Sequence, residues 1–350
     1  MDSTRDAVDY IKGVCIFIIA WGHLIFNNFQ GKFTFFGNQF VAFFFIVSGY
    51  GIYLSISKSM AAGCAFDILG FYRKRFVRIF PLYWLWFGVA SLTSYTLDWS
   101  DFFLCRMYDP PAWFLNAIMH CYIVAPLLYF TAKRLGWWSL PVFCLMLYAV
   151  NVLFRLMGAP DMLVYAYRKI YLFHIFLFAL GMLLPLLLSI KIRLKQTTAL
   201  ITVCFVLFLL ASLQTSSDRV ELLDLTYIKL PYFHLNKYNI VLALSALAIT
   251  YVMLQARPRM PLQDMLMVLG KYSLPIYLFH TYYVNGIVVL LGTDLDMGVY
   301  FIVFTAFFPV LLNPCMLFQT WTDTIGTGVA GVATRLYGRS KPGSLDGVPR

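Results

Sequence analysis

The sequence predicts an all-α protein: a polytopic transmembrane helical bundle of about ten spans with both termini in the cytoplasm. Three observations predict this fold class. Of the 350 residues, 61% are hydrophobic and only 12% are charged, unlike the composition of a soluble domain. Apolar runs long enough to cross a bilayer follow one another along the chain. Lysine and arginine gather in alternate connections between these runs.

Each apolar run is a candidate span, because about 20 consecutive residues of helix cross the hydrocarbon core of a membrane. No polar stretch between the runs is long enough to fold as a second domain. We therefore expect one transmembrane domain over residues 1–325 and a disordered cytoplasmic tail over 326–350. The expected spans are 8–27, 34–56, 77–97, 112–131, 137–154, 170–189, 198–213, 238–255, 270–291 and 298–321.

The charge of the connections predicts the topology. Alternate connections and the C-terminal tail together carry sixteen lysine and arginine residues, whereas the other connections carry eight of them together with nine acids. The basic set marks the cytoplasmic side, which places both termini there. The net charge of +11 then follows from membrane topology and requires no nucleic-acid partner.

The cysteines and the N-terminus exclude two further features. The seven cysteines are scattered, mostly within apolar runs, and lack the spacing of a metal site or a disulfide framework. We therefore expect no metal. The first apolar run has no small-residue cleavage site after it, so we expect a retained span and not a signal peptide.

The first span carries ionisable side chains on one face. On a helix, Arg5, Asp9, Lys12 and His23 fall within about 60° of one another, and Lys12 lies roughly 16 Å from His23 along the axis. Such a stripe in a membrane segment predicts a functional site: Lys12 to attract an anion and His23 to act as a general base. The alternative is a Lys12 that reaches the headgroups and a His23 that only hydrogen-bonds a neighbouring helix.

The second span contains Ser48, Gly49 and Gly51 within a phenylalanine-rich run. Small residues there let another backbone or a ligand approach closely, and ordinary helix packing is the simpler explanation. Ser48 is also a candidate nucleophile or oxyanion donor.

A basic cluster precedes the third span. Arg75 and Arg78 are three residues apart and can share one helix face, where they form a fork for phosphate or pyrophosphate, helped by Arg73. A basic cluster that only sets the topology is equally compatible with this pattern.

The expected outer surface combines acids and aromatic rings. Asp98, Trp113 and Asn116 suit a sugar, whose hydroxyls need hydrogen-bond partners and whose apolar faces pack on rings. The alternative is an interfacial aromatic belt. We expect His120 and His174 to be core residues.

The ninth span contains Tyr277 and His280, which are i, i+3 neighbours on a helix. A hydrogen-bonded polar pair in the bundle interior and a substrate contact are both open explanations.

Together these residues resemble the integral-membrane acyltransferase family three, bacterial enzymes that O-acylate surface glycans. The family has a basic residue and an essential histidine with ten residues between them, here Lys12 and His23, although Arg is more common than Lys at the first position. The matching stretches span most of the chain in the family's order: Arg5, Asp9, Lys12-Gly13 and His23, then 43–50 with Ser48-Gly49, 73–84 with Arg75 and Arg78, 113–115, and 272–280.

The resemblance implies a multi-pass enzyme of the bacterial cytoplasmic membrane. Its donor would be a cytoplasmic acyl-CoA, usually acetyl-CoA, and its acceptor a hydroxyl of a surface glycan or lipid-linked saccharide outside. His23, Lys12 and Ser48 would be catalytic, and Arg73, Arg75 and Arg78 would bind the donor. The rival classes are an exporter or flippase of polysaccharide or lipid-linked sugar and a membrane scaffold.

Overall fold

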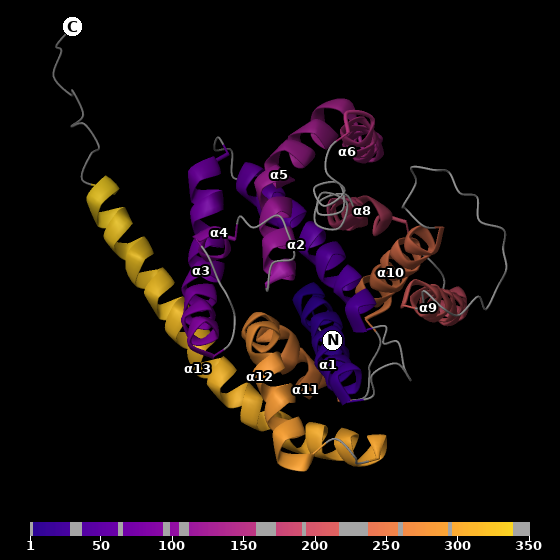
Figure 1. The fold of residues 1–350 in the computed structure, drawn as a ribbon. Coiled ribbons are helices and arrows are strands. Elements are labelled where there is room, and N and C mark those ends of the chain that lie inside the picture. The colour runs from indigo at the N-terminus through magenta and orange to yellow at the C-terminus, as the bar shows by residue number, and fades with distance from the viewer. Residues whose placement is uncertain are drawn as a thin grey trace, which may run out of the picture.

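The computed structural model describes residues 3–28, 37–61, 66–93, 99–104, 112–158, 173–190, 194–216, 237–257, 262–292 and 296–338. All regular structure within these residues is helical, which confirms the all-α fold class (Figure 1). The helices are α1 (Thr4–Asn28), the 3₁₀ helix η1 (Gly37–Phe40), α2 (Val41–Ala61), α3 (Ile68–Thr93), α4 (Trp99–Phe102), α5 (Trp113–Leu135), α6 (Ser139–Leu156), α8 (Phe173–Leu187), α9 (Leu194–Ser216), α10 (Lys237–Ala256), α11 (Gln263–Lys271), α12 (Ser273–Leu291) and α13 (Met297–Gly338).

Each of the ten expected spans overlaps one of these helices. Among the described residues, six helices are long and apolar enough to cross a membrane: α1, α2, α3, α5, α12 and the first part of α13. Three further apolar segments, in α8, α9 and α10, are shorter. The protein is therefore a helical multi-pass membrane protein, while the count of ten and the side of the termini stay predictions.

The basic cluster lies on a helix and not in the long connection expected between the second and third spans. Helix α3 starts at Ile68, where the Asp67 carboxylate accepts a hydrogen bond from the Gly70 N–H (2.8 Å) and so caps the first turn. Buried Phe71 and Ile79 then fasten this end of the helix to the bundle. As a result Arg75 and Arg78 have fixed helical positions.

The expected span 270–291 is divided between two helices. Helix α11 ends at Lys271 and α12 begins at Ser273, with Tyr272 between them. Pro275 explains the break, because proline has no N–H to donate to Lys271 and its ring collides with that carbonyl. The new helix presents Tyr277 to Phe114 of α5 and His280 to His23 of α1.

Two glycine contacts bring helices together backbone to backbone. A Cβ on Gly13 of α1 would lie 1.8 Å from the Leu266 carbonyl oxygen of α11. A Cβ on Gly49 of α2 would lie 2.0 Å from the Phe178 carbonyl oxygen of α8. Both glycines directly follow a candidate site residue, Lys12 or Ser48. Because successive helical residues point about 100° apart, these contacts leave both side chains on other faces.

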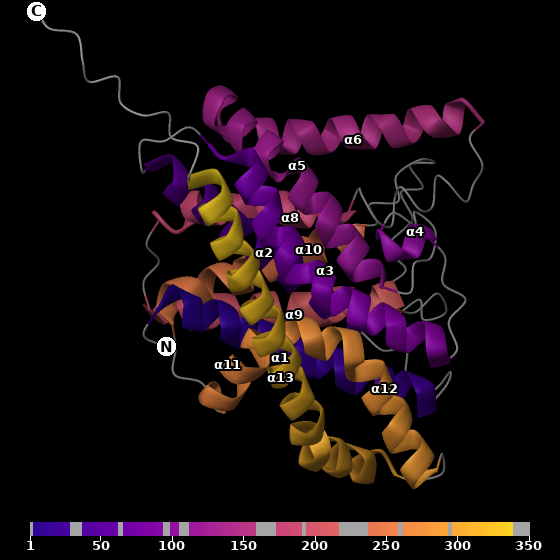
Figure 2. The same ribbon diagram turned by 90° about the vertical axis from the view of Figure 1, so that its left-hand side faces the viewer.

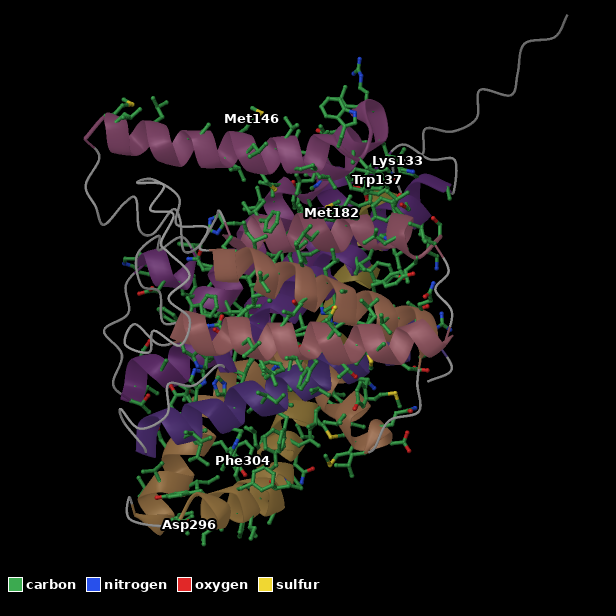
Figure 3. All side chains as sticks on the ribbon, turned by 90° about the vertical axis from the view of Figure 1, so that its right-hand side faces the viewer. Lys133, Trp137, Met146, Met182, Asp296 and Phe304 are labelled. Carbon is green, nitrogen blue, oxygen red and sulfur yellow. The ribbon has the colours of Figure 1, made fainter. Side chains whose placement is uncertain are left out.

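The remaining helices enclose α1 and α2. Helix α8 lies beside α2, α6 and α10, and α10 lies beside both α9 and α1, while α13 runs across the outside of the bundle past α12 and α3 (Figures 1, 2 and 3). Met146 on α6 is 63% exposed, whereas Met182 on α8 is fully buried. An outward apolar face of this kind suits contact with lipid. Helix α13 continues through Gly338, and the rest of the expected tail, 339–350, lies outside the described residues.

Candidate functional site

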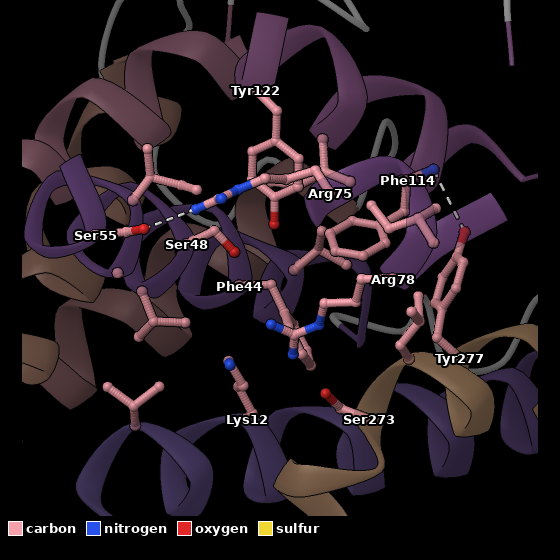
Figure 4. Close-up of a pocket in the computed structure, with 18 of the residues that line it drawn as sticks. Lys12, Phe44, Ser48, Ser55, Arg75, Arg78, Phe114, Tyr122, Ser273 and Tyr277 are labelled. Atoms are coloured by element: carbon pink, nitrogen blue, oxygen red, sulfur yellow. Dashed lines mark hydrogen bonds between the residues drawn. The ribbon is translucent and has the colours of Figure 1, made fainter. Parts of the chain in front are cut away.

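A cavity of about 510 Å³ opens between α1, α2, α3, α5 and α12 (Figure 4). One end is formed by the beginning of α1, the end of α2 and the beginning of α3, near Val8, Ser55 and Lys74. The other end lies near Ile19 and Tyr277. Its polar lining consists of Lys12, Ser48, Ser55, Lys74, Arg75, Arg78, Tyr122, Ser273 and Tyr277.

The cavity is strongly cationic. Four of its lining residues are lysine or arginine, and no acid is among the described residues that line it. Lys12 of α1 and Arg78 of α3 point toward one another in Figure 4. Neither makes a hydrogen bond or an ion pair with another described residue. Two like charges facing a partly enclosed space repel each other, so the arrangement favours binding of an anion.

Arg75 differs from Arg78 because its guanidinium is held in place. One nitrogen donates to the Ser55 hydroxyl (Nη2 to Oγ, 3.0 Å) and the other to the Phe71 carbonyl (Nη1 to O, 3.3 Å). The guanidinium carbon also lies 4.1 Å from the centre of the Phe71 ring, in a cation–π contact. Arg75 is therefore oriented before any ligand arrives, whereas Arg78 is free to follow one.

A row of hydroxyls follows the same wall. Ser48 and Ser55 are seven residues, about two helical turns, apart on α2, with Gly51 between them, and all three line the cavity. The Ser48 side chain lies near the Tyr122 hydroxyl of α5 (Figure 4). Ser48 therefore has a hydroxyl neighbour in place of the histidine base that would activate a serine nucleophile.

Two histidines meet just beyond the far end of the cavity. His23 Nδ1 lies 2.7 Å from His280 Nε2, and the two ring centres are 4.8 Å apart. His23 follows Ile19, a cavity residue, by one helical turn, and His280 follows Tyr277 in the same way. The Tyr277 hydroxyl accepts a hydrogen bond from the Phe114 N–H (3.4 Å). The row of ionisable side chains expected on one face of the first span thus ends at His23, which contacts His280 of α12.

The structure brings together Lys12, Ser48, Arg75, Arg78 and Tyr277 around the cavity, with His23 and His280 adjacent to it. Arg5, at the beginning of the stripe, is exposed and pairs with Asp9 (Nε to Oδ2, 3.8 Å).

Other expected site residues lie elsewhere. Arg73 is exposed and does not line the cavity, whereas its neighbour Lys74 does. Trp113 packs against His174, with 5.3 Å between ring centres, and Asn116 is fully buried in α5. Asp98 lies outside the described residues.

The other two described histidines are structural. His174 is buried and stacks on Phe45 with 4.5 Å between ring centres. His120 is only partly buried, and its Nδ1 lies 2.7 Å from the Asn116 carbonyl of its own helix. Among the described residues, no three histidine, cysteine or acidic side chains gather where they could hold a metal ion.

Sequence reasoning missed Ser55, Lys74, Tyr122 and Ser273. The seven-residue spacing of Ser55 from Ser48 could have placed both on one face of the second span. Lys74 lies within the recognised basic cluster. Nothing in the sequence near Tyr122 indicates that its hydroxyl would reach Ser48 on another helix.

Comparison with known families agrees with this geometry, since an acyltransferase domain family matches residues 5–320. The chain belongs to acyltransferase family 3. The match includes α1, α2, α3, α5 and α12, and therefore the whole cavity and the histidine pair. No curated protein and no solved structure matches the chain. Membership in the family supports acyl transfer by a membrane-embedded enzyme.

Proposed function

We propose that this membrane acyltransferase moves an acetyl group from cytoplasmic acetyl-CoA to a hydroxyl of a cell-surface glycan or lipid-linked saccharide on the outer side of the bacterial cytoplasmic membrane. The observation that carries the proposal is the pair of unpaired cations, Lys12 and Arg78, facing each other across a cavity that leads toward His23. Such a pair needs an anionic ligand, and an acyl-CoA carries phosphates at one end and its thioester at the other.

The cavity residues suit the donor. Arginine binds phosphate oxygens through its planar fork of donors, and the ordered Arg75 beside the freer Arg78 offers two such groups. Lys12 adds a third charge. A volume of about 510 Å³ falls within the range of small-molecule sites. Gly51 has no side chain, and nothing lies within 4 Å of the position that a Cβ would take there. This leaves room along the cavity wall for an extended chain to pass toward Tyr277.

The chemistry falls to His23. When bound, the acyl-CoA supplies an activated acyl thioester. The imidazole of His23 accepts the proton of the acceptor hydroxyl as the hydroxyl oxygen bonds to the thioester carbonyl carbon. The carbon–sulfur bond then breaks, and His23 returns its proton to the leaving thiolate. General-base assistance of this kind contributes on the order of 10²–10⁴-fold in rate.

The acceptor would approach the end of the cavity that holds Tyr277. Two rings meet there, since the centres of Phe114 and Tyr277 lie 4.9 Å apart. Ring faces pack against the apolar faces of sugars, and the Tyr277 hydroxyl has a further lone pair for a sugar hydroxyl. Asn116 is fully buried and Trp113 packs against His174, whereas Tyr277 lines the cavity. Tyr277 is therefore the stronger candidate for contact with the acceptor.

Mass spectrometry of the surface glycan tests the proposal. Cells lacking the protein should make the glycan without a mass of one acetyl group, and the wild-type gene should restore it. His23→Ala should fail to restore it at normal protein level, whereas His120→Ala should succeed, because His120 is not among the residues that line the cavity. Loss of the entire glycan would instead favour the exporter, and full acetylation with His23→Ala would overturn the role of His23.

A further inference from the structure

The contact between His23 and His280 constrains where the protons sit. The two rings face each other through one nitrogen each, His23 Nδ1 and His280 Nε2, 2.7 Å apart. The other nitrogen of His280, Nδ1, lies 2.5 Å from the Tyr277 carbonyl oxygen. Three groups thus form one chain of hydrogen bonds that begins at a main-chain carbonyl of α12 and ends on α1.

The direction of these hydrogen bonds follows from the carbonyl. A carbonyl oxygen can only accept, so Nδ1 of His280 carries the proton. A neutral imidazole has one N–H, which leaves Nε2 of His280 as an acceptor. The proton between the two rings therefore belongs to His23 Nδ1, and His23 Nε2 is left with a bare lone pair.

The surroundings hold this arrangement. His280 is 2% exposed, and a second proton on its ring would place a positive charge in an enclosed position beside another imidazole. The rings are inclined by only 22°, and Tyr277 packs against His280 with 5.8 Å between ring centres. The hydrogen bond to Tyr277 is possible because residues 277–280 are helical, which places the carbonyl of Tyr277 within reach of the His280 ring.

We propose that His280 is a positioning residue that holds His23 in the tautomer with a free Nε2, the atom that accepts the proton of the acceptor hydroxyl. The inference rests on the proposed function, in which His23 is the general base. His280 itself need not touch substrate, in contrast to the substrate contact expected from the sequence. A base must present a lone pair, and the wrong tautomer would present an N–H to the hydroxyl instead.

Nitrogen-15 NMR of the full-length protein in lipid nanodiscs, labelled at histidine, tests the tautomer directly. The chain has only five histidines, and loss of one signal set in His23→Gln assigns His23. Bare and protonated ring nitrogens resonate far apart. We expect wild-type His23 to show a protonated Nδ1 and a bare Nε2. In His280→Leu, the Nε2-protonated form should become populated. A wild-type His23 protonated at Nε2 would overturn the inference.

Kinetics with acetyl-CoA and the acceptor glycan test the consequence. His280→Leu should lower kcat on the order of 10–100-fold with little change in the acetyl-CoA Kd. His280→Gln, whose amide oxygen can accept from His23 Nδ1, should recover part of that loss. In a His23→Ala background, His280→Leu should cause no further loss, because His280 acts through His23.

His120→Leu is the matched control, since His120 also directs Nδ1 at a carbonyl of its own helix but is not among the residues that line the cavity. It should keep the wild-type rate and tautomer. A dead His23→Ala protein combined with a fully active His280→Leu protein would overturn the positioning role alone. A fully active His23→Ala protein would overturn the proposed base, and the two failures are therefore distinguishable.

Discussion

The cationic end of the cavity and the histidine pair differ in whether their polar side chains contact one another. Lys12 and Arg78 face each other without a hydrogen bond or ion pair to any described residue, and no described acid lines their cavity. His23 and His280, about three turns further along α1, already hold each other at 2.7 Å. Unpaired charges gain stabilisation only when an anion arrives, which makes them suited to binding. A paired imidazole is oriented beforehand, which suits proton transfer.

The largest expected effect is a loss of rate, without a loss of donor binding, when His23 is replaced. His23→Gln should lower the rate of acetyl transfer about 10²–10⁴-fold, because the base is lost, while the acetyl-CoA Kd stays near wild type. Single-turnover kinetics give the rate, and isothermal titration gives the Kd. His120→Gln is the control and should keep both values. A Kd that rises in parallel with the rate loss would show that the two regions are not separate.

The next effect belongs to the cationic end. Arg78→Gln should weaken acetyl-CoA binding by about 1.5–3 kcal/mol, the usual contribution of a hydrogen bond to a charged group. That corresponds to roughly 10–100-fold in Kd, measured by titration. The rate at saturating donor should change little.

Lys133→Gln is the matched control for Arg78→Gln. Lys133 is also a cation, but its ammonium lies over the rings of Tyr53 and Tyr129, away from the cavity lining. Its removal should leave the Kd unchanged. Equal affinities of wild type and Arg78→Gln would argue against donor phosphates in this cavity.

A third comparison concerns the scaffold that both regions share. Gly49→Ala should destabilise the protein by about 1–3 kcal/mol, because its Cβ would meet the Phe178 backbone and force α2 away from α8. Gly51→Ala should not, since nothing lies within 4 Å of a Cβ there. Thermal unfolding in detergent measures both. Equal destabilisation by the two substitutions would contradict the close-packing explanation, because alanine has the higher helix propensity and the space around Gly51 is open.

The smallest effect distinguishes neighbouring cations on α3. Lys74→Gln should weaken acetyl-CoA binding by less than about 1 kcal/mol, because its exposed ammonium is a single point charge and lacks the planar fork of donors that Arg78 offers to a phosphate. Arg73→Gln should leave the Kd unchanged, because Arg73 is exposed outside the lining. Titration across a salt series gives both values. A larger effect at Arg73 would restore its expected role as a donor-binding residue.

Much of the fold could be read from apolar run lengths. All ten expected spans overlap helices, because a segment in a bilayer must satisfy its own backbone hydrogen bonds. Helix ends were less accessible. The break at Tyr272 depends on Pro275, and the start of α3 depends on the Asp67 cap, which composition over a long window does not register.

The site was predictable where one helix carries the pattern. Lys12, Ser48 and the Arg75–Arg78 pair each stand out within a single segment, and all line the cavity. Trp113 stood out for the same kind of reason, as an aromatic residue at an expected surface, and it packs against His174 instead. A residue's type indicates what it can bind, whereas its neighbours on other helices decide whether it is available.

The sequence by itself determined the helical, membrane-embedded fold class and the residue types on each helix face, because these follow from local hydropathy and periodicity. It also indicated the family, through short motifs that stand in the family's order along the chain. Only the tertiary structure decided that Lys12 faces Arg78, that Tyr122 meets Ser48, and that His23 meets His280. The physical reason is that these pairs join helices far apart in the chain. Their contacts depend on how the helices pack against one another, a property of the bundle and not of any one segment.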